Sequence, residues 1–485
     1  MINFKIVLRS VFIVLVPLIL TACLGNTAED KKEDVNPNPG ELTDNETYWE
    51  EFKLIEPKRN GLMNPYFEAV IDSDKNIHIV YYSVSEKAEN ISDGLYDLNY
   101  AIWNTTTQEF APHPTAPIIS TQTYTERMAL AIDGQNQLYV SYRGGKNRAC
   151  RGGTVPSDAM FSVFDGTQWT EYTGAIGYVE RAGGVLLDGY AGPHTDLVVD
   201  GEDNVHMIYQ FLYEGCDATS AAYPDLFYAS KMPSQFANDN RSDAEIEEQV
   251  SGNDADNGGT FQNYTGEVSN IILDADGNPL VFYYSEDSTR SNYGLFMGYR
   301  DDENNWITEA IRKNCKVVDI SAGLAPNGDI HVAYVIDVCN DETGDSKFSL
   351  RHARKQPSVV VETEGGDPIV VFETEWENGY VVDDIYVGGT GRHLSMVMNK
   401  NGLPQIAYFE LQTYDDKDLK NLKSIEVTID GRYLKDDIAR WNDIGRYNKM
   451  LTDQDGEIYV LSYDSESHSI HLFVEGVNGR LVSED

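Results

Sequence analysis

Short apolar runs alternate with polar turns along most of the chain, and one such arrangement recurs seven times. In residues 268–287 an apolar run reaches Asp274, an Asp-Ala-Asp-Gly turn follows, and a second apolar run ends in Tyr283 and Tyr284. This pattern predicts a β-hairpin, because an Asp side chain can bond its own backbone and Gly accepts a positive φ. Six further copies lie at residues 68–82, 129–142, 196–209, 321–334, 395–408 and 449–463.

Further strand-like runs follow each hairpin. After the second hairpin these are residues 158–166 and 167–174, and after the fifth they are residues 348–354 and 358–364. The third unit lacks a clear fourth run. Four antiparallel strands repeated seven times predict an all-β fold, a seven-bladed β-propeller of four-stranded antiparallel blades.

Residues 48–57 resemble the outermost runs of the other units and precede the first hairpin. An open propeller would expose two sheet edges, so we expect this segment to pair with the last blade and close the ring. The repeat as a whole, an apolar run followed by Asp-x-Asp-Gly-Asn-x-His and a run ending in Tyr, is similar to the unit of bacterial exported propellers. That resemblance implies a fold and not a chemistry.

The first 22 residues predict an export signal, with Lys5 and Arg9 before an apolar segment and small residues at its end. The sequence Leu-Thr-Ala-Cys that ends at Cys23 resembles the processing box of bacterial lipoproteins. The resemblance implies that Cys23 is lipidated. Leu24 follows where an Asp would signal inner-membrane retention, which implies the outer membrane, on its periplasmic or cell-surface face. The alternative is an ordinary signal peptide.

Residues 23–47 are polar and charged with almost no apolar side chain, so they predict a flexible acidic tether after the lipidated cysteine. The propeller then occupies residues 48–485.

The chain is strongly acidic, with 37 Lys and Arg against 79 Asp and Glu and a formal charge of −42. Phosphate backbones require clustered cations, so nucleic acid is not an expected partner. No phosphate-binding loop, metalloprotease motif or nucleophile elbow occurs, and we expect neither a cofactor nor a metal. A polyanionic ligand would need a local basic pocket within this acidic surface.

Four cysteines besides Cys23 predict two disulfides in an exported, oxidising setting. Cys150 and Cys216 fall in the same loop of adjacent blades and are expected to pair. Cys315 precedes the fifth hairpin and Cys339 follows it, which predicts the second pair. The alternative, a four-cysteine zinc site, lacks the close C-x-x-C spacing.

Long insertions indicate which rim of the propeller carries a site. Loops between second and third strands share one rim with the links between blades, and we place four insertions there: residues 143–156, 210–224, 335–347 and 365–391. Long loops on a rigid scaffold often carry binding sites. The first strand of every blade begins on this rim, so its first residues should surround the mouth of the central channel.

The predicted mouth is polar. Counting back the same six places from each turn gives one residue per blade: Tyr66, Arg127, His194, Val268, Asp319, His393 and Tyr447. Glu68, Asp196, Glu267, Arg392 and Arg446 lie close to them in sequence. These residue types suit proton transfer and the neutralisation of a substrate carboxylate.

We therefore predict His194, His393, Tyr447 and Arg127 as catalytic residues. The predicted ligand-binding residues are Tyr66, Glu68, Asp196, Asp319, Arg392 and Arg446. The alternative is that these polar side chains only line a wet channel. His78, His206 and His331 share one position in the second strand and are interpreted as structural.

Three classes of function fit these features. The first is an outer-membrane lipoprotein that binds a glycan at its long-loop face, with or without cleaving it. In fold and residue types the chain resembles propeller-fold polysaccharide lyases, such as those acting on ulvan, which implies a Tyr or His base and an Arg facing a uronate. The second is a noncatalytic scaffold for another envelope protein, and the third a structural surface module. Sialidases share the scaffold, but their S-x-D-x-G-x-x-W pattern is missing from the expected turns.

Overall fold

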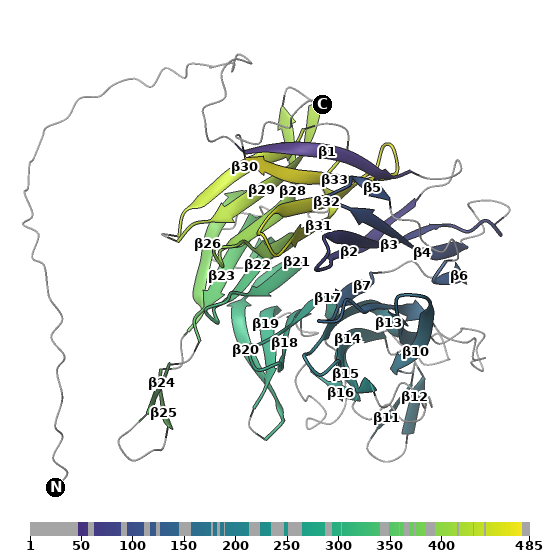
Figure 1. The fold of residues 1–485 in the computed structure, drawn as a ribbon. Coiled ribbons are helices and arrows are strands. Elements are labelled where there is room, and N and C mark those ends of the chain that lie inside the picture. The colour runs from purple at the N-terminus through teal and green to yellow at the C-terminus, as the bar shows by residue number, and fades with distance from the viewer. Residues whose placement is uncertain are drawn as a thin grey trace, which may run out of the picture. The chain divides into compact units, whose positions relative to one another are not determined.

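Seven antiparallel sheets form the predicted seven-bladed propeller in a computed structural model of the chain (Figure 1). The chain divides into two units, Met1–Glu46 and Thr47–Asp485, and every described residue belongs to the second. No helix among these residues has the length and hydropathy needed to cross a membrane. The structure describes residues 47–56, 63–88, 95–110, 117–122, 127–144, 157–175, 178–181, 185–188, 190–212, 224–233, 247–250, 264–286, 293–301, 303–339, 349–357, 359–362, 368–372, 375–384, 393–414, 417–429, 431–440 and 443–477.

The first four blades are built from strands in chain order, innermost strand first. Blade 1 contains β2 (Met63–Ile71), β3 (Asn76–Val84), β4 (Tyr96–Asn104) and β5 (Glu109–Phe110), with β6 (Ile119–Gln122) also paired to β4. Blade 2 contains β7 (Ala129–Ile132), β8 (Leu138–Gly144), β9 (Asp158–Phe164) and β10 (Trp169–Ala175). Blade 3 contains β13 (Tyr190–Val199), β14 (Val205–Leu212), β15 (Pro224–Lys231) and β16 (Glu247–Gln249). Blade 4 contains β17 (Tyr264–Leu273), β18 (Pro279–Glu286), β19 (Tyr293–Arg300) and β20 (Trp306–Lys313).

The last three blades include one insertion and the closure of the ring. Blade 5 contains β21 (Cys315–Leu324), β22 (Ile330–Cys339), β23 (Ser349–Lys355) and β26 (Glu377–Asp384). Blade 6 contains β27 (Ser395–Met398), β28 (Pro404–Tyr414), β29 (Lys417–Val427) and β30 (Tyr433–Ala439). Blade 7 contains β31 (Arg446–Thr452), β32 (Ile458–Asp464), β33 (Ser469–Val477) and, outside them, β1 (Thr47–Ile55).

In six of the seven hairpins, the side chain of the first turn residue stabilises the turn; the fifth hairpin has Ala325 at this place. Asp72 Oδ1 accepts the backbone N–H groups of Asp74 and Asn76 at 2.9 and 2.7 Å. The same pair of bonds forms at Asp133, Asp200, Asp274, Asn399 and Asp453. The side chain thereby supplies the hydrogen-bond acceptors that two backbone N–H groups of a tight turn would otherwise lack. This explains why Asp recurs at the position.

The Tyr that ends each hairpin is a core residue. It lies on the second strand of its blade, and burial of such a ring contributes a large apolar area to the packing between blades. The copies with at most 2% of their surface exposed are Tyr82, Tyr142, Tyr209, Tyr283, Tyr334 and Tyr408. The recurring Tyr therefore belongs to the fold and not to a binding surface.

The seven innermost strands contact one another in a closed ring, in the order β2, β7, β13, β17, β21, β27, β31 and back to β2. Blade 7 closes this ring as predicted, because β1 pairs antiparallel with β33 from Thr47–Val477 to Ile55–Ile470. Figure 1 shows β1 beside β33, although the two segments come from opposite ends of the sequence.

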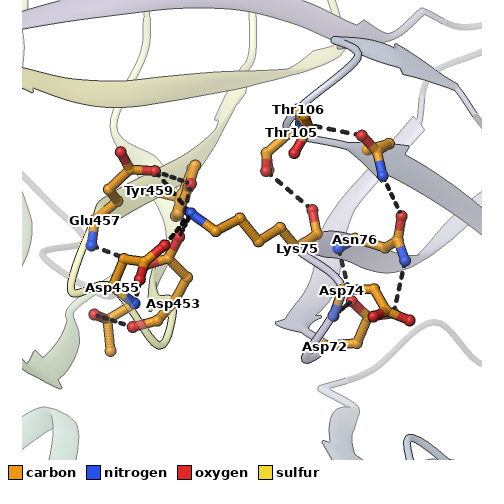
Figure 2. Close-up of polar contacts among 12 residues, drawn as sticks. Asp72, Asp74, Lys75, Asn76, Thr105, Thr106, Asp453, Asp455, Glu457 and Tyr459 are labelled. Carbon is orange, nitrogen blue, oxygen red and sulfur yellow. Dashed lines mark hydrogen bonds and ion pairs between the residues drawn. The ribbon is translucent and has the colours of Figure 1, made fainter.

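A lysine also fastens blade 1 to blade 7. The Lys75 ammonium, from the first hairpin turn, lies 2.9 Å from Asp453 and 2.7 Å from Asp455 of the last hairpin turn, and 3.4 Å from Glu457 (Figure 2). These carboxylates raise the pKa of Lys75. Lys75 has a φ of 61°, in the left-handed region where later turns of the chain place Gly277, Gly328, Gly402 and Gly456.

The structure departs from the sequence prediction in blade 5. Residues 358–364 were expected as its fourth strand, and this is wrong: β24 (Val359–Glu362) pairs with β25 (Pro368–Phe372) in a separate hairpin, and β26 is the fourth strand. This hairpin is inserted between the third strand, β23, and the fourth strand, β26. It therefore begins on the rim that carries the short turns within the hairpins, and not on the rim of the long loops, where we placed residues 365–391. A second unpredicted hairpin, β11 (Tyr178–Arg181) with β12 (Val185–Asp188), lies between blades 2 and 3.

Candidate functional site

One cavity, of about 360 Å³, lies at the mouth of the ring where the innermost strands begin. Every blade contributes to its lining. The seven residues found by counting back from the hairpin turns all line it: Tyr66, Arg127, His194, Val268, Asp319, His393 and Tyr447. Four of their neighbours line it as well, namely Glu68, Asp196, Glu267 and Arg446. The structure thus brings together all the predicted site residues that it describes. Their roles in binding or catalysis stay a prediction.

Irregular pairing of the inner strands shapes this mouth. The register between first and second strands shifts between Met63 and Phe67, between Ala191 and Thr195, between Thr265 and Ser269, and between Arg446 and Asn448. Tyr66, His194, Val268 and Tyr447 lie within these bulges. A bulge releases a residue from strict strand alternation and can redirect its side chain, so in these four blades it can turn one residue toward the opening.

Arg127 is a cation that reaches into the cavity. Its Nη2 atom lies 4.0 Å from Asp319 Oδ1, and its side chain is 35% exposed. Arg127 precedes β7 of blade 2 and Asp319 lies on β21 of blade 5, so the pair spans the ring between blades that are not neighbours. Asp319 already accepts the N–H groups of Ile320 and Leu394 at 3.0 and 2.8 Å. The guanidinium is therefore only loosely paired and remains accessible from the cavity.

The other described cations of the lining are held more tightly. Lys449 Nζ lies 2.6 Å from Glu68 Oε2, which joins blade 7 to blade 1. Arg446 Nε lies 2.9 Å from Asp443 Oδ1, and its guanidinium lies 5.6 Å from the centre of the Phe409 ring. Short ion pairs of this kind leave less capacity for a ligand, so Arg127 is the best placed of the three to bind an incoming anion.

Aromatic side chains from blades 6, 7 and 1 form one wall. The ring centres of His393 and Tyr447 are 3.7 Å apart, and those of Tyr447 and Tyr66 are 5.1 Å apart in an edge-to-face arrangement. Tyr447 has a φ of 57°, which is rare for a bulky residue and costs ~1–3 kcal/mol. The surrounding structure must hold this conformation, in which the Tyr447 ring lies between its two neighbours.

The acidic residues of the lining bind the neighbouring blade. Asp196 Oδ2 on β13 accepts Asn270 Nδ2 at 2.7 Å and the Ile271 N–H at 3.1 Å on β17. At the same repeat position, Asn270, Ser321 and Ser395 accept the N–H groups of Ala322, Met396 and Met450 in the next blade. Asp319, two positions earlier, accepts the Leu394 N–H. Burial raises the pKa of Asp196, against the opposing effects of the Asn270 hydrogen bond and the Arg127 charge. Asp196 and Asp319 thus hold the ring together, whatever their part in ligand binding.

Sequence reasoning missed Lys449 and Asn448 in the lining. Both lie within two residues of Tyr447. Extending the count by one or two positions along each inner strand would have found them. Among the predicted residues, Arg392, Cys23, Cys150 and Cys216 lie outside the described residues. The Cys315–Cys339 disulfide is confirmed, at the start of β21 and the end of β22.

The recurring histidines of the second strand lie away from the mouth and are hydrogen-bonded. His78 contacts Tyr100 Oη at 2.6 Å and Asp72 Oδ2 at 3.0 Å. His206 repeats this arrangement with Tyr228 and Asp200 at 2.6 and 3.1 Å. These bonds link the hairpin turn to the third strand, as expected of structural residues.

Blade 5 replaces that arrangement with a histidine pair. His331 Nδ1 lies 3.0 Å from His352 Nε2, and both residues are at most 5% exposed. Ala325 stands where blade 1 has Asp72, and Asp329 pairs with Arg354 instead. Burial lowers the pKa of His331 to about 4 and that of His352 to about 3.

A larger cavity of about 1150 Å³ lies elsewhere, beside blade 7. Its lining includes Lys75, Asp455 and Glu457, which already pair with one another where blade 7 meets blade 1. The mouth is therefore the stronger candidate despite its smaller volume. No group of three or more His, Cys, Asp or Glu in the described part of the chain is arranged to hold a metal ion.

No protein-family model matches the sequence, and no curated protein matches it. Solved structures do share the fold. An ulvan lyase of polysaccharide lyase family PL25, bound to -[GlcA(1-4)Rha3S]-, has 12% identity with this chain and a TM-score of 0.50; the match covers 88% of this chain and 96% of the lyase. A GH93 α-L-arabinofuranosidase of Fusarium graminearum has 9% identity and a TM-score of 0.41, over 90% of this chain and 98% of its own. The structural neighbours thus include carbohydrate-active propeller enzymes, and at these identities the likeness concerns the fold alone.

Proposed function

We propose that the propeller binds an acidic glycan in the mouth cavity and can cleave it as a lyase. The observation that carries this proposal is the state of Arg127. Its guanidinium is partly exposed inside the cavity, and its ion pair with Asp319 is long, at 4.0 Å. A guanidinium can bind a carboxylate through two parallel hydrogen bonds. In a chain of formal charge −42, Arg127 is a local positive charge in a cavity, at which an anionic group of a ligand can bind.

The aromatic wall suits the other part of a sugar. Rings of Tyr66, His393 and Tyr447 offer an apolar surface on one side of the cavity, while Arg127 approaches from blade 2. A pocket with an apolar wall and a few placed polar groups is the usual form of a small-ligand site. The carbohydrate-active enzymes among the structural neighbours support a saccharide as this ligand.

Lyase cleavage of a uronate-containing chain needs three functions. A base removes the proton from the carbon that bears the carboxylate, a cation neutralises that carboxylate as negative charge develops, and an acid protonates the departing glycosidic oxygen while a carbon–carbon double bond forms. Arg127 would serve as the cation. His194, His393 and Tyr447 are the proton-transfer groups that line the same cavity.

A screen of acidic and neutral polysaccharides tests this function, with retention of the protein and release of unsaturated product as readouts. Arg127→Gln should weaken binding of the acidic hits by about tenfold or more, the effect of losing a hydrogen bond to a charged group. Arg300→Gln is the matched control, because Arg300 lies on β19, outside the lining of the cavity. Equal binding of every hit by Arg127→Gln and the parent would refute the proposal. Binding without product would leave a glycan-binding protein and remove the lyase step.

We also propose that the protein is anchored to the bacterial outer membrane through lipidated Cys23. The support is the sequence Leu-Thr-Ala-Cys that ends the export signal, together with Leu24 after it. A membrane anchor would hold the propeller in the cell envelope, where glycans are encountered.

A further inference from the structure

The mouth cavity is enclosed around its whole circumference. Its lining takes residues from all seven blades, and the inner strands contact one another in a closed ring. A groove across a surface is open at two ends, whereas a cavity ringed in this way admits a ligand along the ring axis. A chain that enters along this axis brings its end into the cavity first.

The Arg127 side chain crosses this cavity. Because Arg127 belongs to blade 2 and its partner Asp319 to blade 5, the guanidinium lies inside the ring and not against its own blade. A ligand carboxylate that binds Arg127 must therefore reach between opposite sides of the ring.

The space available is small. At about 360 Å³ the cavity lies near the lower end of the roughly 300–1,000 Å³ that small-ligand pockets span. An internal stretch of a polymer would need room for the bound sugar and for both chain arms in one opening. A chain end needs room for the bound sugar and a single arm.

We propose that the cavity recognises the terminal acidic sugar of a glycan, with room for about one or two units, and not an internal stretch of the chain. The inference rests on the proposed function, because the same cavity and Arg127 bind the ligand. The aromatic wall from blades 6, 7 and 1 would contact one face of the terminal ring, and Arg127 its carboxylate. Each polymer chain then offers a fixed number of sites, however long it is.

The number of protein molecules bound per chain tests this inference. Oligomers and size-fractionated polymers of glucuronate and of galacturonate serve as probes, with the two free sugar acids as competitors. Sedimentation at saturating protein should give about one propeller per chain at every length, and the free sugar acid should displace the polymer. With an active protein, the first products should be one or two units long.

Two failures are distinguishable. Occupancy that rises in proportion to chain length, with binding still lost in Arg127→Gln, would overturn end recognition and leave the proposed function standing. The same conclusion follows if free sugar acids fail to compete with a polymer whose binding needs Arg127. Failure of all probes to bind, or binding indifferent to Arg127→Gln, would refute both.

Discussion

Lys75 joins the first hairpin turn in blade 1 to the last hairpin turn in blade 7, and its replacement should lower the stability of the propeller by an amount that the structure allows us to predict. Lys75→Met keeps the length of the side chain and removes its charge. The partner that matters is Asp453, whose side chain is 1% exposed and lies 2.9 Å from the ammonium (Figure 2). Hydrogen bonds to charged groups contribute about 1.5–3 kcal/mol, so the free energy of unfolding should fall by about that amount. Asp455 is 70% exposed at 2.7 Å and should add little.

A second variant separates the ion pair from the backbone. Lys75→Gly removes the same charge but also relieves a residue held at a φ of 61°. The left-handed conformation costs a non-glycine residue roughly 1–2 kcal/mol, and glycine gives part of this back through its more flexible unfolded chain. Lys75→Gly should therefore be less destabilised than Lys75→Met by about 1 kcal/mol.

Urea denaturation followed by tryptophan fluorescence measures both variants, with Lys313→Met as the control at an exposed lysine of β20. If Lys75→Met unfolds at the same urea concentration as the parent, the contact between the two turns does not stabilise the ring. If Lys75→Gly is the weaker of the two variants, the assumed backbone strain is wrong.

Two further predictions concern other parts of the chain. The pKa values of His331 and His352 are about 4 and about 3, below the usual value near 6.5, so the unfolded chain binds more protons than the folded one in this range. The free energy of unfolding should therefore fall as the pH drops from about 6.5 towards 4, by up to about 1.4 kcal/mol per pH unit for each histidine. His352→Tyr installs the residue found at this place in blades 1 and 3 and should roughly halve that slope in denaturation curves taken from pH 7 to 4.5; an unchanged slope would exclude the pair as its source. Cys23→Ser should release the protein from membrane fractions or leave it unprocessed, and a processed variant that stays membrane-bound would contradict lipidation.

The repeat was readable from the sequence because its signals are local. Asp274 bonds its own turn and Tyr283 fills the space beside its own strand, so each copy carries its own evidence. The same holds for Cys315 and Cys339, which flank one hairpin. The prediction for residues 358–364 was wrong because a strand-forming run does not indicate which strand it pairs with. Here β24 pairs with β25 and not with β23.

The site was only partly readable. Counting from the turns found the residues at the mouth, because residues at the same distance from the turn lie at the same height on every inner strand. It did not reveal that Asp319 binds Leu394 of the next blade, nor that Arg127 crosses the ring to Asp319. Those contacts join residues 75 or more positions apart, and they depend on how the blades are set around the axis. Local patterns contain no such information.

The central claim is that Arg127 binds a ligand carboxylate, and a double-mutant cycle tests it most directly. Binding of an acidic oligosaccharide identified in the screen, and of the same compound with its carboxyl groups reduced to alcohols, is measured by calorimetry for the parent and for Arg127→Gln. If the guanidinium and the carboxylate interact, either change alone should cost about 1.5–3 kcal/mol, and the second change should then cost almost nothing more. Additive losses would mean that Arg127 and the carboxylate do not meet, and would contradict the account.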